Sequence, residues 1–155
     1  MEENQIPPII SLHRYWVTAD GIRERMLLDV PTHARAGSIQ QMPADLVDAG
    51  QWWSRALALS VFYGLLHVVI DGYRELELSD EKLDKLLGQG DYVDRLRRFR
   101  NAVFHFHKDP FDAKLTEFLE ADASDAWIKA VYKSLKQFFE RELPIREELG
   151  GLSAS

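Results

Sequence analysis

The chain contains no cysteine among its 155 residues. Disulfide bridges, cysteine-ligated zinc and a cysteine nucleophile are therefore excluded. Long hydrophobic runs are also missing, because the longest, from Val61 to Ile70, is too short to span a bilayer and contains His67. The acidic, polar first residues, MEENQIPP, do not resemble a secretory signal. We therefore expect a cytoplasmic protein that is not embedded in a membrane.

Alternation of apolar and polar residues between hairpin turns is missing too, so no strand is expected. There is no internal repeat and no glycine-rich phosphate loop. Apolar residues recur instead at helical spacing in several segments. The predicted helices cover residues 9–29, 45–73, 80–88 with Ser79 as the cap, 91–108, a short segment beginning at Asp109-Pro110, and 124–143.

These segments predict an all-α fold, a helical bundle of five to six helices. The segment 45–73 is apolar on nearly all sides and is the expected central buried helix, and residues 31–44 are the expected loop before it. We expect a single domain over residues 1–150, followed by a disordered tail at 151–155.

Negative charge exceeds positive charge over the whole chain, but one segment is basic. The net charge is −6, which argues against nucleic-acid binding by the whole surface. Residues 91–108, however, carry a net charge of +3, which leaves −9 on the remainder. The same segment contains two of the five histidines, His105 and His107.

The spacing of these histidines decides what they can do. Apolar residues at helical intervals, Val93, Leu96, Phe99, Val103 and Phe106, predict that the segment is helical. On a helix, His105 and His107 lie about 200° apart and cannot bind one metal ion together. The zinc pattern H-E-x-x-H is also absent, so no metal site is expected.

Other polar residues on the same helix favour a different chemistry. Asn101 and His105 are four residues apart and would share an outward face, whereas Arg100 can be paired with either His105 or His107. RNA can be cut without a metal if a base removes the 2′-hydroxyl proton, an acid protonates the leaving oxygen and a cation stabilises the phosphorane. Histidine and arginine suit these roles. One arginine and one histidine make half a site, which a two-fold dimer would complete.

The motif Arg100-Asn101-x-x-x-His105 in a small all-α domain resembles that of the HEPN superfamily. The resemblance implies a bundle that dimerises through the motif helix and acts as a metal-independent endoribonuclease without a cofactor. It also implies a toxin with an antitoxin partner, or a component of antiphage defence. Under this resemblance Arg100 binds phosphate, Asn101 orients the site and His105 is the catalytic histidine, whereas the second histidine, His107, departs from the motif.

Simpler interpretations stay open for the same residues. The face of Arg100, Asn101 and His105 can be a solvated surface or the interface of a catalytically inactive dimerisation or binding module. Arg97 and Arg98 can contact RNA phosphates, as substrate-binding residues together with His107, or form salt bridges. His107 can instead pack near the helix end.

Overall fold

The computed structural model describes residues 7–28, 46–108, 113–118 and 123–143. Within these residues every regular element is a helix, which confirms the predicted all-α bundle. The helices are α1 (Pro8–Leu28), α2 (Leu46–Glu75), α3 (Glu81–Leu87), α4 (Tyr92–Phe104), α5 (Ala113–Thr116) and α6 (Ser124–Glu142). The predicted loop at 31–44, the predicted helix start at Asp109-Pro110 and the predicted tail lie outside the described residues.

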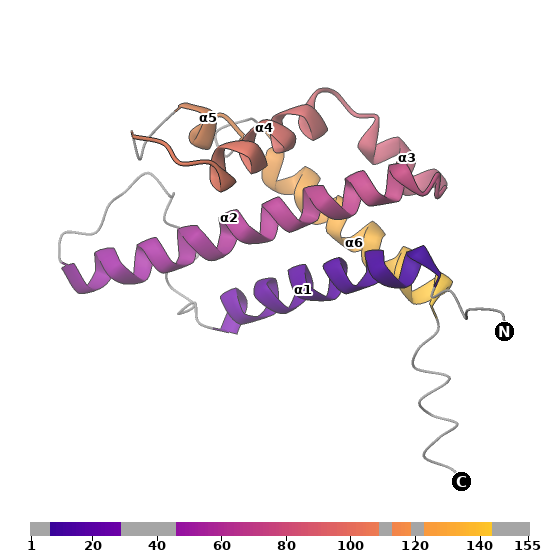
Figure 1. Ribbon diagram of the computed structural model, residues 1–155, viewed down its shortest axis with the longest axis horizontal. Helices are drawn as coiled ribbons and strands as arrows, with labels where there is room; N and C mark the ends of the chain where they lie inside the picture. Colours follow the sequence, from indigo (N-terminus) through magenta and orange to yellow (C-terminus); the bar gives the residue numbers. More distant parts are fainter. Residues whose placement is uncertain (1–6, 29–45, 109–112, 119–122, 144–155) are drawn as a thin grey trace, which may run out of the picture.

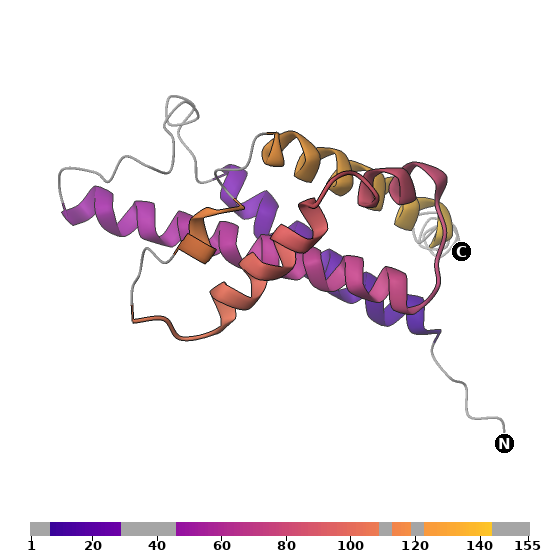
Figure 2. The same cartoon turned by 90° about the horizontal axis from the view of Figure 1, so that it is seen from above.

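Helix α2 is the long central element, and the other helices are arranged around it (Figure 1). α1 runs antiparallel to α2 along one side, and α4 crosses α2 on another side. The view from above in Figure 2 shows α6 beside α3, with which it is in contact. The short helix α5 lies against α4. α4 is thus held by α2 and α5 and keeps one face outward.

The buried core follows the helical spacing of apolar residues. α2 contributes side chains from several of its faces, since it is covered from several directions: Phe62, Tyr63, Leu66, Val69, Ile70 and Tyr73. The last helix buries residues at helical spacing in the same way: Trp127, Val131, Leu135 and Phe138.

An aromatic seam joins α1 to α6. The ring of Trp16 lies 5.0 Å from the ring of Tyr132 and 5.9 Å from that of Phe139, measured between centroids. The hydroxyl of Tyr132 donates a hydrogen bond to the carboxylate of Asp20, and the guanidinium of Arg23 lies 4.0 Å from the centre of the Tyr132 ring. Burial and the bond to Asp20 raise the pKa of Tyr132 to about 12. The first and last helices are thereby fixed to each other.

Residues 54–75 of α2 satisfy the length and composition of a membrane span, with a mean hydropathy of 1.5. However, 44% of the apolar window in this segment is buried inside the fold. The central helix of a bundle has the same composition because it must be apolar on several faces. The packing of α2 against α1 and α4 agrees with the predicted role as the central helix.

The close approach of α1 and α2 depends on Gly72. A Cβ atom at this position would lie 2.4 Å from Cδ1 of Leu12, which is buried in the core. Gly72→Ala is expected to lower the free energy of unfolding by about 1–2 kcal/mol, because overpacking costs more than the gain in helix propensity. Gly21 on α1 is the matched control, since a Cβ there would meet nothing within 4 Å. Gly21→Ala should stabilise the fold by about 0.5–1 kcal/mol.

Urea unfolding of both glycine variants measures this difference. Opposite signs for the two substitutions are expected. Equal stabilisation by both would show that Leu12 moves aside without cost and that the α1–α2 contact is not tightly packed.

Two predicted element ends are wrong. The cap of α3 is Asp80 rather than Ser79, because the Asp80 carboxylate accepts a hydrogen bond of 2.8 Å from the backbone N–H of Leu83. The hydroxyl of Ser79 instead donates to Asp84 at 3.1 Å. The predicted helix over 91–108 ends early, since α4 stops at Phe104. The second difference changes the geometry of the candidate site.

Candidate functional site

Helix α4 is anchored by an aromatic cluster that brings together three parts of the chain. The ring of Phe99 lies 5.8 Å from those of Tyr63 on α2 and Phe118 after α5, and Tyr63 and Phe118 are 5.5 Å apart. Phe99 is buried, as is Leu96 one turn earlier. These contacts fix the rotation of α4 and so determine which of its residues point outward.

The end of α4 corrects the expected position of the histidines. His105 is the C-cap residue, with an extended backbone at φ −112° and ψ 144°, and residues 106–108 are not helical. Asn101 and His105 therefore do not share one helical face, and the argument that a helix turns His105 and His107 apart does not apply. His105 is exposed and His107 is half-buried.

A tertiary contact at Phe104 accompanies this helix end. The Phe104 ring lies against the backbone of α2 at Gly64, where an added Cβ would come within 2.5 Å of Cε2 of the ring. The same ring is still 57% exposed. The last residue of α4 is thus held against α2 while its ring stays partly exposed.

The predicted apolar face of the helix is therefore only partly right. Leu96 and Phe99 are buried and Val93 and Val103 are half-buried, as their spacing predicts. Phe106 was expected on the same face, but it is 91% exposed. It lies beyond the helix end, so helical spacing no longer directs it toward the core.

Most arginines of α4 form ion pairs with carboxylates on the surface. The pairs, with their nitrogen–oxygen distances, are Arg95–Asp91 at 2.8 Å, Arg97–Asp94 at 3.5 Å and Arg98–Glu117 at 3.2 Å. The salt-bridged edge that the sequence allowed is thus present. Such exposed pairs contribute little to stability, and each arginine can exchange its carboxylate for a phosphate.

Arg100 differs from these arginines. Its guanidinium donates a hydrogen bond of 2.8 Å to Oδ1 of Asn101, and within the described residues it forms no ion pair with a carboxylate. Arg100 is half-buried and Asn101 is exposed. The structure thus joins Arg100 to Asn101 and leaves the positive charge of Arg100 uncompensated there. It does not bring His105 of the same chain into hydrogen bonding with either residue.

A buried histidine of α2, His67, lies close enough to Arg100 to be influenced by its charge. His67 is 1% exposed, and its Nδ1 lies 3.1 Å from Oδ2 of Asp71 without the alignment of a hydrogen bond. Its Nε2 has no hydrogen-bond partner in the described part of the chain. The sequence places His67 in the apolar centre of the expected central helix, and its burial agrees with that position. The four-residue spacing to Asp71 is the sequence signal that would have identified the neighbour.

The charges around His67 favour its neutral form. Burial is the main cause that lowers its pKa; Asp71 opposes this effect, whereas Arg100, Arg97 and Arg74 add to it. Because the unfolded chain binds a proton near pH 6.5 and the folded chain binds it only at lower pH, the free energy of unfolding should fall as pH decreases below about 6.5. The loss stops below the folded pKa, where both states are protonated.

Denaturant unfolding between pH 7.5 and pH 5 tests this dependence. His67 contributes a slope of up to about 1.4 kcal/mol per pH unit within the window, and His67→Gln should remove that contribution. His13, whose pKa burial also lowers, adds to the slope in both proteins, so the difference between them reports His67. Identical slopes for wild type and His67→Gln would contradict the prediction.

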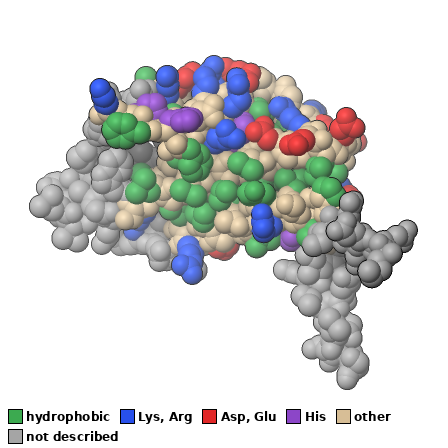
Figure 3. Space-filling model, in the orientation of Figure 1, with side chains coloured by type: hydrophobic (Ala, Val, Ile, Leu, Met, Phe, Trp, Pro, Cys, Tyr) green, Lys and Arg blue, Asp and Glu red, His purple; other side chains and the backbone are tan. Residues whose placement is uncertain are grey.

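The surface view shows how these residues are distributed. Lys, Arg and His side chains gather along the edge formed by α4 and the residues that follow it, above a band of hydrophobic side chains over α2 and α1 (Figure 3). The concentration of positive charge predicted for residues 91–108 is thus presented on one edge of the molecule, although the ion pairs described above neutralise part of it.

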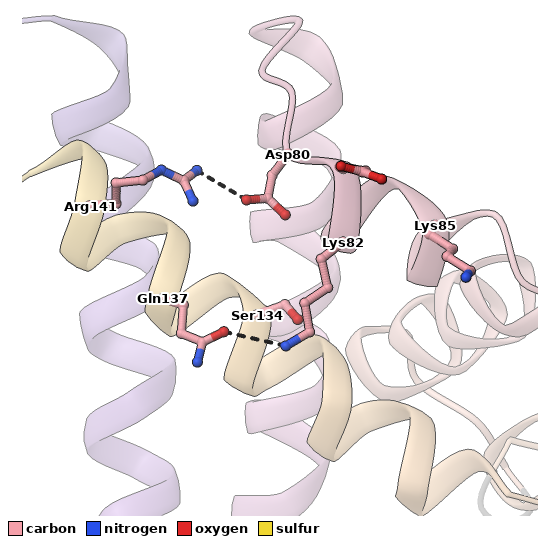
Figure 4. Close-up of a pocket in the computed structure, with 7 residues that line it drawn as sticks. Asp80, Lys82, Lys85, Ser134, Gln137 and Arg141 are labelled. Atoms are coloured by element: carbon pink, nitrogen blue, oxygen red, sulfur yellow. Dashed lines mark hydrogen bonds and ion pairs between the residues drawn. The ribbon is translucent and has the colours of Figure 1, made fainter.

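A separate hollow of about 430 Å³ lies between α3 and α6. Two of its three cations have partners, because Arg141 pairs with Asp80 at 3.0 Å and Lys82 contacts Gln137 at 3.5 Å, and Lys85 also lines it (Figure 4). Buried Ser134 also lines it. None of the residues that the sequence singled out for chemistry lines this hollow.

Comparisons with known proteins do not assign the chain. No family model matches it, and no significant similarity to a curated protein or to a solved structure is found. Among the described residues, no group of three or more His, Asp or Glu side chains could hold a metal ion. The geometry of α4 and its surroundings is therefore the basis for any functional proposal.

Proposed function

We propose that the protein is a metal-independent endoribonuclease of the HEPN type that acts as a homodimer. The observation that carries the proposal is the state of Arg100, which is oriented by Asn101 and has no carboxylate partner in the described residues. A half-buried guanidinium held in this way is ready to bind a phosphate through its planar fork. The HEPN-type motif Arg100-Asn101-x-x-x-His105 gives the reaction class.

Two copies of the chain would complete the chemistry. One imidazole removes the proton of a ribose 2′-hydroxyl, whose oxygen attacks the adjacent phosphorus. A second imidazole protonates the departing 5′-oxygen, and Arg100 stabilises the charge that develops on the phosphorane. The products are a 2′,3′-cyclic phosphate and a 5′-hydroxyl end. Because His105 is exposed at the end of α4, a partner chain packed along α4 can bring its own His105 toward Arg100.

Incubation of purified protein with RNA in EDTA tests the proposal. Fragments that a polynucleotide kinase can label at the 5′ end without prior dephosphorylation are expected, because the mechanism leaves 5′-hydroxyl groups. Sedimentation measurements should give twice the mass of the 17.9 kDa chain. Intact RNA together with a stable dimer would replace the proposal with a catalytically inactive binding module.

We place the enzyme in the cytoplasm as a toxin controlled by an antitoxin, or as a component of antiphage defence. Expression of the active protein without its antitoxin should then arrest growth and fragment cellular RNA. Normal growth, with RNA cleavage retained in vitro, would contradict the role in toxicity or defence but not the enzymatic activity.

A further inference from the structure

Phe106 is the most unusual surface residue in the described part of the chain. It is 91% exposed, whereas the next most exposed large hydrophobic side chain, Leu57, is 61% exposed. Burial of a phenylalanine side chain would contribute about 1.5–3 kcal/mol to the free energy of unfolding, and an exposed ring does not provide this contribution. It is also not part of the packing contact made by Phe104, which lies on α2 at Gly64. The part of the chain that the structure describes does not bury this ring.

The sequence neighbours of Phe106 are mostly polar, although the ring of Phe104, two residues earlier, is also 57% exposed. The immediate neighbours of Phe106 are His105 and His107, and Lys108 follows, with His105 and Lys108 both exposed. An aromatic ring beside imidazoles and a lysine suits a nucleic-acid strand, because the ring stacks on a base while the polar groups contact the backbone. A hydrophobic protein partner would favour an apolar surround instead.

The position of Phe106 relative to the proposed reaction centre is also informative. Phe106 directly follows His105 in the chain, so their Cα atoms are about 3.8 Å apart. The phosphate and the base of one nucleotide are likewise separated by a single sugar. A nucleotide whose phosphodiester lies at His105 can therefore place its base, or the neighbouring base, at Phe106.

Resting on the proposed ribonuclease function, we propose that Phe106 stacks on an unpaired base beside the scissile phosphodiester. Phe106 is then a positioning residue that makes the enzyme select single-stranded RNA. A paired base offers no free face to the ring, so duplex RNA would gain nothing from this contact. The arginines on the surface of α4 would add sequence-independent affinity for the phosphates.

A binding experiment with an RNA that cannot be cleaved tests Phe106 separately from catalysis. The probe is a 2′-O-methyl oligoribonucleotide that contains 2-aminopurine, so that fluorescence reports base stacking and anisotropy reports binding. Phe106→Ala should weaken affinity for the single strand about 5- to 150-fold and remove the fluorescence change on binding. Phe106→Trp should retain both. Leu57→Ala is the matched control, because Leu57 is an exposed apolar residue on α2, outside the basic segment.

The outcomes separate the two proposals. Equal affinity of wild type and Phe106→Ala for the single strand would overturn the stacking role even if the wild type cleaves RNA. A loss of dimerisation in Phe106→Ala with unchanged RNA affinity would assign the ring to a protein contact and overturn it as well. Binding that depends on Phe106 in a protein that does not cleave RNA would reject only the proposed catalysis. Absence of any wild-type binding would overturn both.

Discussion

The Arg100→Ala protein is expected to cleave RNA about 100- to 1000-fold more slowly than the wild type at saturating substrate. The physical reason is that the phosphorane carries more negative charge than the ground state, and an aligned guanidinium stabilises that additional charge. Asn101 supplies the alignment through its 2.8 Å bond to Arg100. The loss should therefore appear in kcat rather than in KM alone.

Three comparisons separate this role from simple charge attraction. Arg100→Lys keeps the charge without the planar fork and should recover only a small part of the rate. Arg97→Ala should raise KM and weaken the salt dependence without a comparable loss in kcat, since Arg97 is exposed and already paired with Asp94. Arg25→Ala, an exposed substitution on α1, is the control for a change in net charge.

The histidine variants complete the same prediction. His105→Ala should lower kcat by about 100- to 10,000-fold, because it removes the group that transfers the proton. His107→Ala should have a smaller effect, since His107 is half-buried and does not belong to the motif. All variants should keep the helical circular dichroism of the wild type. A greater loss in His107→Ala than in His105→Ala would move the catalytic role to His107, and equal cleavage by every variant would reject the site.

The fold was predictable because burial and spacing agree along most helices. The stripe of α6 and the apolar centre of α2 bury the residues that helical spacing selects. The spacing failed at Phe106, which fits the apolar pattern of α4 yet lies beyond its end. The helix ends at Phe104, whose ring contacts α2 at Gly64, and a pattern within one segment carries no information about that contact.

The candidate site was predictable only in part for the same reason. The hydrogen bond of Arg100 to Asn101 joins adjacent residues of the motif, whereas the sequence predicted Asn101 and His105 on one face. The position of His105 depends on the helix end, and the influence of Arg100 on His67 depends on the packing of α4 against α2. Both are tertiary effects. The cap at Asp80 shows a local limit as well, because two adjacent residues, Ser79 and Asp80, are both good caps by type.

Trp127→Ala is expected to lower the free energy of unfolding by about 3–5 kcal/mol, the largest effect of a single substitution on stability considered for this fold. Trp127 is 4% exposed, so its truncation leaves a cavity where α6 meets α3 and α4. Its indole N–H donates a 2.9 Å hydrogen bond to the carbonyl of Leu86, near the end of α3. Its ring also stacks on Tyr92, the first residue of α4, with 5.3 Å between centroids.

A graded series distinguishes these contributions. Trp127→Phe keeps an aromatic ring against Tyr92 but removes the indole donor to the Leu86 carbonyl, which still accepts a 3.2 Å bond from the backbone N–H of Gln89. A smaller loss of about 0.5–1.5 kcal/mol is therefore expected from this bond. Lys129→Ala changes an exposed side chain on the solvent side of the same helix, where Lys129 pairs with Asp125. It should change stability by less than about 1 kcal/mol. Because Tyr92 begins the helix that carries Arg100, Trp127→Phe should also reduce RNA cleavage at temperatures where the protein is still folded. Full activity in a destabilised Trp127→Phe protein would show that α2 and α5 position α4 without help from α6.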